Sequence, residues 1–260
     1  MTDALRAEWA KLRTISGTWW LMVGAVALTV GASAGIAAST HVSPGGPGGA
    51  NQDPTKLSLI GVDLGQAVVA VLTVMAITDE YATGMIRVTL AATPLRAIML
   101  GAKAVNIAGL ALVTGAPAVA GCLIAGHLLL PYAGLDPAHG YALISIAHGP
   151  TLRAAVGSVL YLGLIALLSL GVGTVFRDTA VSTGIVLGLL YLPPLLAQLL
   201  SGPWRRHIQQ LAPMSAGLAI QATRSIPSLP ISPWAGLGIL AAWSTGLLLV
   251  AFVVLKARDA

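Results

Sequence analysis

The sequence predicts an all-α membrane protein with six transmembrane helices, and three observations support this fold class. Of the 260 residues, 56% are hydrophobic and 9% carry a charge, and the mean hydropathy is +0.86. Soluble domains contain about 25% charged residues. The few charged residues also cluster, so that six long stretches contain at most one charge each. Each stretch can hold the roughly 20 residues that a helix needs to cross a bilayer.

The predicted spans occupy the gaps between charged residues. These gaps cover residues 14–52, 57–78, 104–135, 154–176, 179–204 and 225–255. We therefore expect spans at about 18–39, 58–78, 98–130, 153–175, 180–200 and 234–256. No tandem repeat of 20–50 residues is found, so residues 1–260 are expected to form a single transmembrane domain.

Residues 1–17 are expected to form an interfacial elbow helix on the inner leaflet. Apolar side chains fall on one helical face and basic side chains lie around it, as in helices that lie in the headgroup layer. The positions concerned are Leu5, Trp9, Lys11, Leu12 and Arg13. The alternative is a charged anchor that only fixes the topology.

The basic residues predict the orientation. Six spans place both termini on one side, and that side carries nine Lys and Arg residues against five on the other. Because basic residues accumulate in cytoplasmic loops, the termini are expected in the cytosol. Residues 201–233, on the outer side, contain five prolines and several apolar residues. We expect them to form short outer helices between the fifth and sixth spans.

The chain offers little catalytic chemistry. It contains no GxxxxGK[ST] loop, no HExxH and no CxxC. The five histidines are scattered, and no basic patch is interleaved with aromatics. We therefore expect no catalytic residue, no metal, no cofactor bound by this chain and no nucleic-acid partner.

Asp63 is the only acidic residue inside a predicted span, and Gln66 follows on the same face. Ionisable residues within spans are functional candidates by default. Both residues are candidates for lining a transport pathway. The alternative is a structural hydrogen-bonding role.

Glycines at four-residue spacing allow close packing of helices in lipid. Such pairs are Gly31 with Gly35, Gly61 with Gly65, and Gly184 with Gly188. The packing could lie within one subunit or across a dimer, and the sequence leaves both open.

The segment 79–96 is charged and lies between two long apolar stretches. We expect a cytosolic helix that Thr78 or Asp79 caps and that ends at Thr93-Pro94. Its apolar residues fall on two opposite faces, which favours one contact with the bundle and another with a cytosolic protein. The alternative is an ordinary inner loop whose arginines bind headgroups.

Two motifs resemble the permease subunits of type-2 ABC exporters. In the charged segment the matching residues are Glu80, Tyr81, Gly84, Ile86, Arg87, Thr93-Pro94, Arg96 and Lys103. Near the N-terminus they are Glu8, Lys11, Leu12, Arg13, Thr14 and Trp19. The span count and the proline-rich connection before the last span agree along essentially the whole chain. At Ala82-Thr83 the sequence carries less charge than many relatives.

The resemblance implies a bacterial inner-membrane exporter of hydrophobic or amphipathic substrates, such as drugs. The subunit would pair with a second copy or a paralogue and with a separate cytosolic ATPase, which binds ATP and Mg²⁺. The 79–96 segment would be the coupling hairpin, and 201–233 the outer gate. The implied ATPase-coupling residues are Asp79, Glu80, Tyr81, Gly84, Met85, Arg87 and Arg96.

Two other functions remain open. One is a secondary transporter or channel that uses Asp63 as its ion site. The other is a membrane subunit for immunity or sensing that transports nothing.

Overall fold

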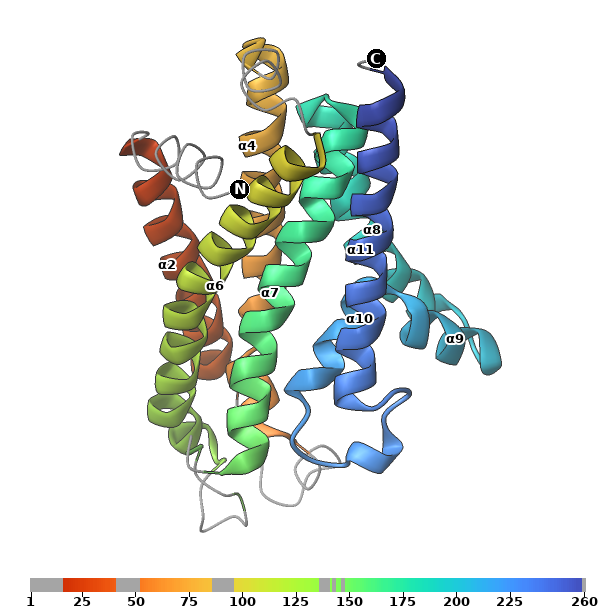
Figure 1. Cartoon of the computed structure of the whole chain (residues 1–260). Coiled ribbons are helices and arrows are strands. Elements are labelled where there is room, and N and C mark those ends of the chain that lie inside the picture. Colours follow the sequence, from red (N-terminus) through yellow and green to blue (C-terminus); the bar gives the residue numbers. More distant parts are fainter. Residues whose placement is uncertain are drawn as a thin grey trace.

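The computed structural model describes residues 16–40, 52–85, 96–135, 141, 144–145 and 148–258. Within these residues the chain forms helices and no strand, and six helices are long and apolar enough to cross a membrane. Figure 1 shows them running side by side between two ends of the molecule. The predicted six-span, all-α membrane fold is therefore confirmed. The interfacial helix with Leu5, Trp9, Lys11, Leu12 and Arg13 lies outside the described residues.

The long helices are α2 (Ser16–Ser39), α4 (Val62–Ala82), α6 (Arg96–Leu129), α7 (Gly149–Phe176), α8 (Thr179–Leu199) and α11 (Pro233–Arg258). Short helices lie toward one end of the bundle, which we call the cavity end (Figure 1). They are α3 (Pro54–Ser58), η1 (Leu130–Ala133), α9 (Pro203–Leu211), α10 (Pro213–Gly217), η3 (Leu218–Gln221) and η4 (Ile226–Ser228). One of them, α9, projects from the side of the bundle (Figure 1). The opposite end, where α4 ends and α6 begins, is the hairpin end.

Helix α7 is the centre of the bundle. Of its most apolar stretch 67% is buried, against 22% for α8 and for α11. Its glycines allow the neighbours to approach closely. A Cβ atom on Gly171 would lie 2.9 Å from Leu247 of α11, and one on Gly173 would lie 2.5 Å from Ile77 of α4. Close packing of this kind is what holds helices together where no hydrophobic effect acts between them.

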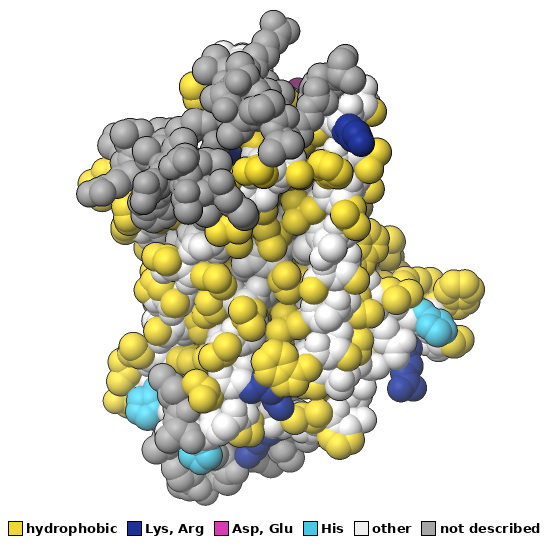
Figure 2. Space-filling model, in the orientation of Figure 1, with side chains coloured by type: hydrophobic (Ala, Val, Ile, Leu, Met, Phe, Trp, Pro, Cys, Tyr) yellow, Lys and Arg dark blue, Asp and Glu magenta, His cyan; other side chains and the backbone are white. Residues whose placement is uncertain are grey.

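The surface agrees with a bilayer setting. Hydrophobic side chains cover the middle of the face in Figure 2, and Lys and Arg side chains lie toward the two ends. Large apolar residues such as Leu21, Val113 and Val253 are more than half exposed on the long helices. Lipid tails are as apolar as these side chains, so their exposure carries no penalty in a membrane.

A two-residue turn connects α7 with α8. Arg177 adopts the left-handed conformation, with φ 60°, and its N–H donates to the Gly173 carbonyl at 2.9 Å. The carboxylate of Asp178 then accepts from the backbone N–H of Val181 at 2.8 Å and caps α8. Helix α8 continues to Leu199 through Pro193 and Pro194.

Helix α4 is shifted relative to the predicted span 58–78. It runs from Val62 to Ala82, so Asp79 and Glu80 belong to its last turn. The expected helix start at Thr78 or Asp79 is wrong, since the Thr78 hydroxyl donates to the Val74 carbonyl inside α4. The sequence criterion stopped the span at the first charge, whereas the helix continues because Glu80 is neutralised within the bundle.

The glycine pairs divide into two groups. A Cβ atom on Gly61 would lie 2.1 Å from the Thr29 carbonyl oxygen of α2, so α2 and α4 pack closely there. In contrast, among the described residues a Cβ on Gly31, Gly35 or Gly184 would meet nothing within 4 Å, and one on Gly188 would meet only Leu192 of its own helix. Packing within the chain, one of the two predicted alternatives, is therefore wrong for these four glycines. Their α2 and α8 faces point away from the subunit's own core.

Candidate functional sites at the two ends of the bundle

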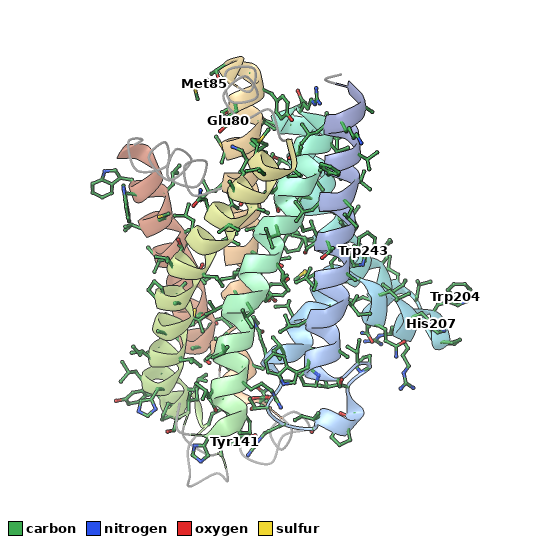
Figure 3. The ribbon with its side chains drawn as sticks, viewed as in Figure 1. Glu80, Met85, Tyr141, Trp204, His207 and Trp243 are labelled. Atoms are coloured by element: carbon green, nitrogen blue, oxygen red, sulfur yellow. The ribbon has the colours of Figure 1, made fainter. Side chains whose placement is uncertain are left out.

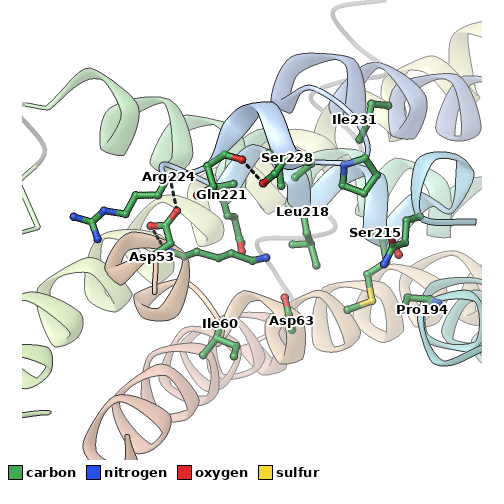
Figure 4. Close-up of a pocket in the computed structure, with 18 of the residues that line it drawn as sticks. Asp53, Ile60, Asp63, Pro194, Ser215, Leu218, Gln221, Arg224, Ser228 and Ile231 are labelled. Atoms are coloured by element: carbon green, nitrogen blue, oxygen red, sulfur yellow. Dashed lines mark hydrogen bonds between the residues drawn. The ribbon is translucent and has the colours of Figure 1, made fainter. Parts of the chain in front are cut away.

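A cavity of about 830 Å³ opens at the cavity end, within the size range of small-molecule sites. Its walls come from α3, the first turn of α4, the end of α8, and the segment from α9 to η4, as Figure 4 shows in part. Lining residues include charged groups, four glutamines, and apolar side chains such as Leu57, Ile60 and Leu218. The cavity therefore combines polar groups with an apolar surface.

Asp53 ties the walls of the cavity together. Its carboxylate caps α3 by accepting from the Lys56 backbone N–H at 3.2 Å, and Pro54 follows at the first helical position. The same carboxylate accepts from the Thr223 hydroxyl at 2.7 Å, the Arg224 N–H at 2.9 Å, and the Thr223 N–H. Asp53 thus joins two segments about 170 residues apart.

Two arginines also bind the segment around Thr223 that Asp53 contacts. Arg153 of α7 donates to the Ala222 carbonyl at 2.6 Å. The Arg224 guanidinium lies 5.0 Å from the centre of the Tyr141 ring, a cation–π contact, and donates to the Gln52 carbonyl at 3.4 Å. The segment between α10 and α11 is therefore fixed by charged groups even though its helices are short.

The structure separates the two predicted pathway residues. Asp63 lines the cavity, and Figure 4 shows its side chain pointing into it. Gln66 is fully buried inside the bundle, where its Oε1 accepts from the Tyr161 hydroxyl of α7. The predicted lining role is therefore wrong for Gln66, which instead takes the alternative structural role. Gln66 follows Asp63 by three residues, and its side chain points toward Tyr161 of α7 and not into the cavity.

At the hairpin end, Glu80 and Lys103 form an ion pair inside the bundle. Lys103 Nζ lies 2.6 Å from Glu80 Oε1, and the two side chains are 4% and 9% exposed, respectively. The pair joins the last turn of α4 to α6. Next to it, the Arg177 guanidinium lies 4.9 Å from the Tyr81 ring centre, which connects α4 to the α7–α8 turn. The hydroxyls of Thr78 and Thr179 add a third link at 2.7 Å.

The other predicted coupling residues differ in position. Asp79 is exposed on α4, and Met85 is 46% exposed beyond it. Figure 3 shows Glu80 and Met85 at the same end of the molecule. Gly84 has a φ of 70°, a conformation that glycine adopts without strain, and it redirects the chain after α4. The Arg87 position and the Arg96 side chain lie outside the described residues.

Several residues at these sites were missed by the sequence reasoning. Lys56, Gln221 and Arg224 line the cavity, but they are ordinary loop residues in the sequence. The Asp53-Pro54 pair carried a usable signal, because an acid before a proline is typical of a helix start. The role of Lys103 as the partner of Glu80 had no local signal, since 23 residues separate them.

In the described part of the chain, no group of three or more His, Cys, Asp and Glu side chains could hold a metal ion. Comparison of the chain with known protein families, curated proteins and solved structures found no match. The functional argument therefore rests on the geometry of the two ends and on the sequence resemblance.

Proposed function

We propose that this chain is the permease subunit of an ATP-driven exporter of the type-2 ABC kind in a bacterial inner membrane. The observation that carries the proposal is the buried Glu80–Lys103 pair. The pair joins α4 to α6 close to residues 83–95, which connect the two spans. A cytosolic ATPase that moved this connection would move both spans together, because the pair resists their separation.

The cavity end supports the same proposal from the other side of the membrane. Helices α4 and α8 contribute to the cavity wall and both run to the hairpin end. A movement of α4 at its last turn would therefore reach Asp63 in its first turn. Residues 201–233 would then act as the outer gate over the cavity.

The exposed glycine faces support pairing with a second permease. Gly31 and Gly35 on α2, and Gly184 and Gly188 on α8, leave room that no other helix of the described part of the chain fills. A second copy or a paralogue could approach closely at such faces. ATP and Mg²⁺ would bind the separate ATPase, which we expect to dock on the hairpin through Asp79, Met85 and Arg87.

The neighbouring open reading frames are first searched for a Walker-motif ATPase, and the full chain is then co-expressed with it. Residues 84–93 are replaced by a Gly-Ser linker of equal length, which leaves Glu80 and Lys103 in place. We expect the wild type to co-purify with an active ATPase and the variant to lose it. Replacement of residues 41–50, on the other side of the membrane, is the matched control. Co-purification of the 84–93 variant at wild-type level would sink the coupling role of the hairpin.

A secondary transporter is the second candidate, because the Asp63 carboxylate faces the cavity and makes no hydrogen bond or ion pair with any residue the structure describes. This candidate predicts transport in proteoliposomes that contain the chain alone and a proton gradient. Asp63→Asn would abolish that transport. ATP-dependent transport only in the presence of the ATPase selects the exporter instead.

A further inference from the structure

The charged residues of the cavity fall into two groups. Asp53 and Arg224 are committed to the protein, because they bind backbone groups and an aromatic ring that fix the cavity wall. Lys56, Asp63 and Arg205 bind no such group. Their side-chain charges form no hydrogen bond or ion pair with residues 16–40, 52–85, 96–135, 141, 144–145 or 148–258. The cavity thus presents two cations, Lys56 and Arg205, and one anion, Asp63, that are available to a ligand.

Lys56 and Asp63 belong to one compact part of the fold, and their opposite charges attract each other without forming an ion pair. Lys56 lies in α3 and Asp63 in the first turn of α4, which follows α3 after a short turn. Both line the same cavity. A simple anion at Lys56 would meet the Asp63 carboxylate as a like charge, and a simple cation at Asp63 would meet the Lys56 ammonium. A ligand with both signs meets an opposite charge at each of the two groups.

Gln221 gives an independent indication of a ligand. It lines the cavity and is 2% exposed, yet its Nε2 has no hydrogen-bond partner among the described residues. Buried side-chain donors nearly always bond to protein, water or a ligand. The amide of Gln221 is therefore a donor for an acceptor that enters the cavity from outside the protein.

The apolar part of the wall sets the rest of the ligand. Leu57, Ile60, Met214, Leu218 and Ile231 line the cavity beside the polar groups. We propose that the cavity binds a zwitterionic amphipath. Its ammonium group pairs with Asp63, its phosphate or carboxylate pairs with Lys56 and accepts from Gln221, and its apolar part lies on these five side chains. Such a ligand is either a phospholipid from the outer leaflet or a soluble zwitterion.

Binding is measured by microscale thermophoresis on the purified full chain in maltoside micelles. Four probes separate the contributions: lysophosphatidylethanolamine, its tail-less head glycerophosphoethanolamine, dodecyl phosphate and dodecylamine. We expect lysophosphatidylethanolamine to bind more tightly than either single-charge probe. Equal binding of the tail-less head assigns a soluble source, and much weaker binding of it assigns the membrane.

Two charge-removing variants test the assignment of each group. Asp63→Asn should weaken lysophosphatidylethanolamine and dodecylamine by about 10-fold and leave dodecyl phosphate unchanged, as expected for a lost charge-assisted hydrogen bond. Lys56→Gln should weaken lysophosphatidylethanolamine and dodecyl phosphate and leave dodecylamine unchanged. Lys56 is exposed and outside the spans, so this variant tests the inference even if Asp63→Asn folds poorly.

The matched controls remove one charge of each sign at the hairpin end. Asp178→Asn keeps the cap of α8, because Asn is an equally good N-cap, and Lys256→Gln removes an exposed cation. Both should bind all probes as the wild type does. The inference is overturned if lysophosphatidylethanolamine binds no more tightly than the single-charge probes, or if both cavity variants bind it normally. The assay contains neither ATP nor ATPase, so its outcome is independent of the proposed export function.

Discussion

The strongest quantitative prediction concerns the ion pair at the hairpin end. Replacement of Lys103 by Met leaves the Glu80 carboxylate in a place where it is 9% exposed and has lost a cation at 2.6 Å. Breaking a buried pair by removing one partner costs about 3–5 kcal/mol, because the remaining charge loses the opposite charge beside it. Removing both charges often changes the free energy of unfolding only slightly. The variants Lys103→Met, Glu80→Leu and their double combination therefore form an informative cycle.

The free energy of unfolding is followed through thermal unfolding in detergent, monitored by circular dichroism. For a chain of this size, the single variants should lower Tm on the order of 10 °C, and the double variant should recover most of that loss. Lys256→Met removes an exposed cation at the same end of the bundle and should change Tm little, since surface pairs contribute at most about 1 kcal/mol. A Lys103→Met protein that unfolds at the wild-type temperature would refute the reasoning, as would a double variant no more stable than the single ones.

Three further predictions follow from the same geometry. In a background without the native cysteine, a membrane-impermeant maleimide added to intact cells should label Ser201→Cys and not Thr83→Cys; the reverse pattern would invert the proposed topology. Gly61→Ala should lower Tm, since a Cβ there would lie 2.1 Å from a backbone oxygen, whereas Gly35→Ala should not. Equal Tm values for the two variants would contradict the close contact of α2 and α4. Asp53→Ala should speed hydrogen exchange at the Thr223 and Arg224 amides, because the carboxylate that accepts from them is lost; unchanged exchange would show that these hydrogen bonds are dispensable.

The fold class could be predicted from the sequence for a simple physical reason. A charge is costly in hydrocarbon, so charged residues mark the ends of spans, and the six spans emerged from their gaps. The one clear boundary error has the same origin. Glu80 was read as lying outside the membrane helix, but a charge that is neutralised by Lys103 can lie within the helix.

The functional groups depended on contacts that join distant parts of the chain. Asp63 could be selected from the sequence, because it is an isolated acid in a span. Its separation from Gln66, one turn away, required the position of Tyr161 on α7. Likewise, the sequence could not show which cavity charges are bound by the protein, because Asp53 binds Thr223, which lies about 170 residues away in the chain.

The sequence by itself therefore determined the number of spans, their approximate limits and their alternation across a membrane, because each depends only on local hydropathy and on charge. The tertiary structure decided which glycines pack within the chain, which charges neutralise each other, and which remain open to a ligand. These properties depend on distances between helices, and side-chain packing of the whole bundle sets those distances.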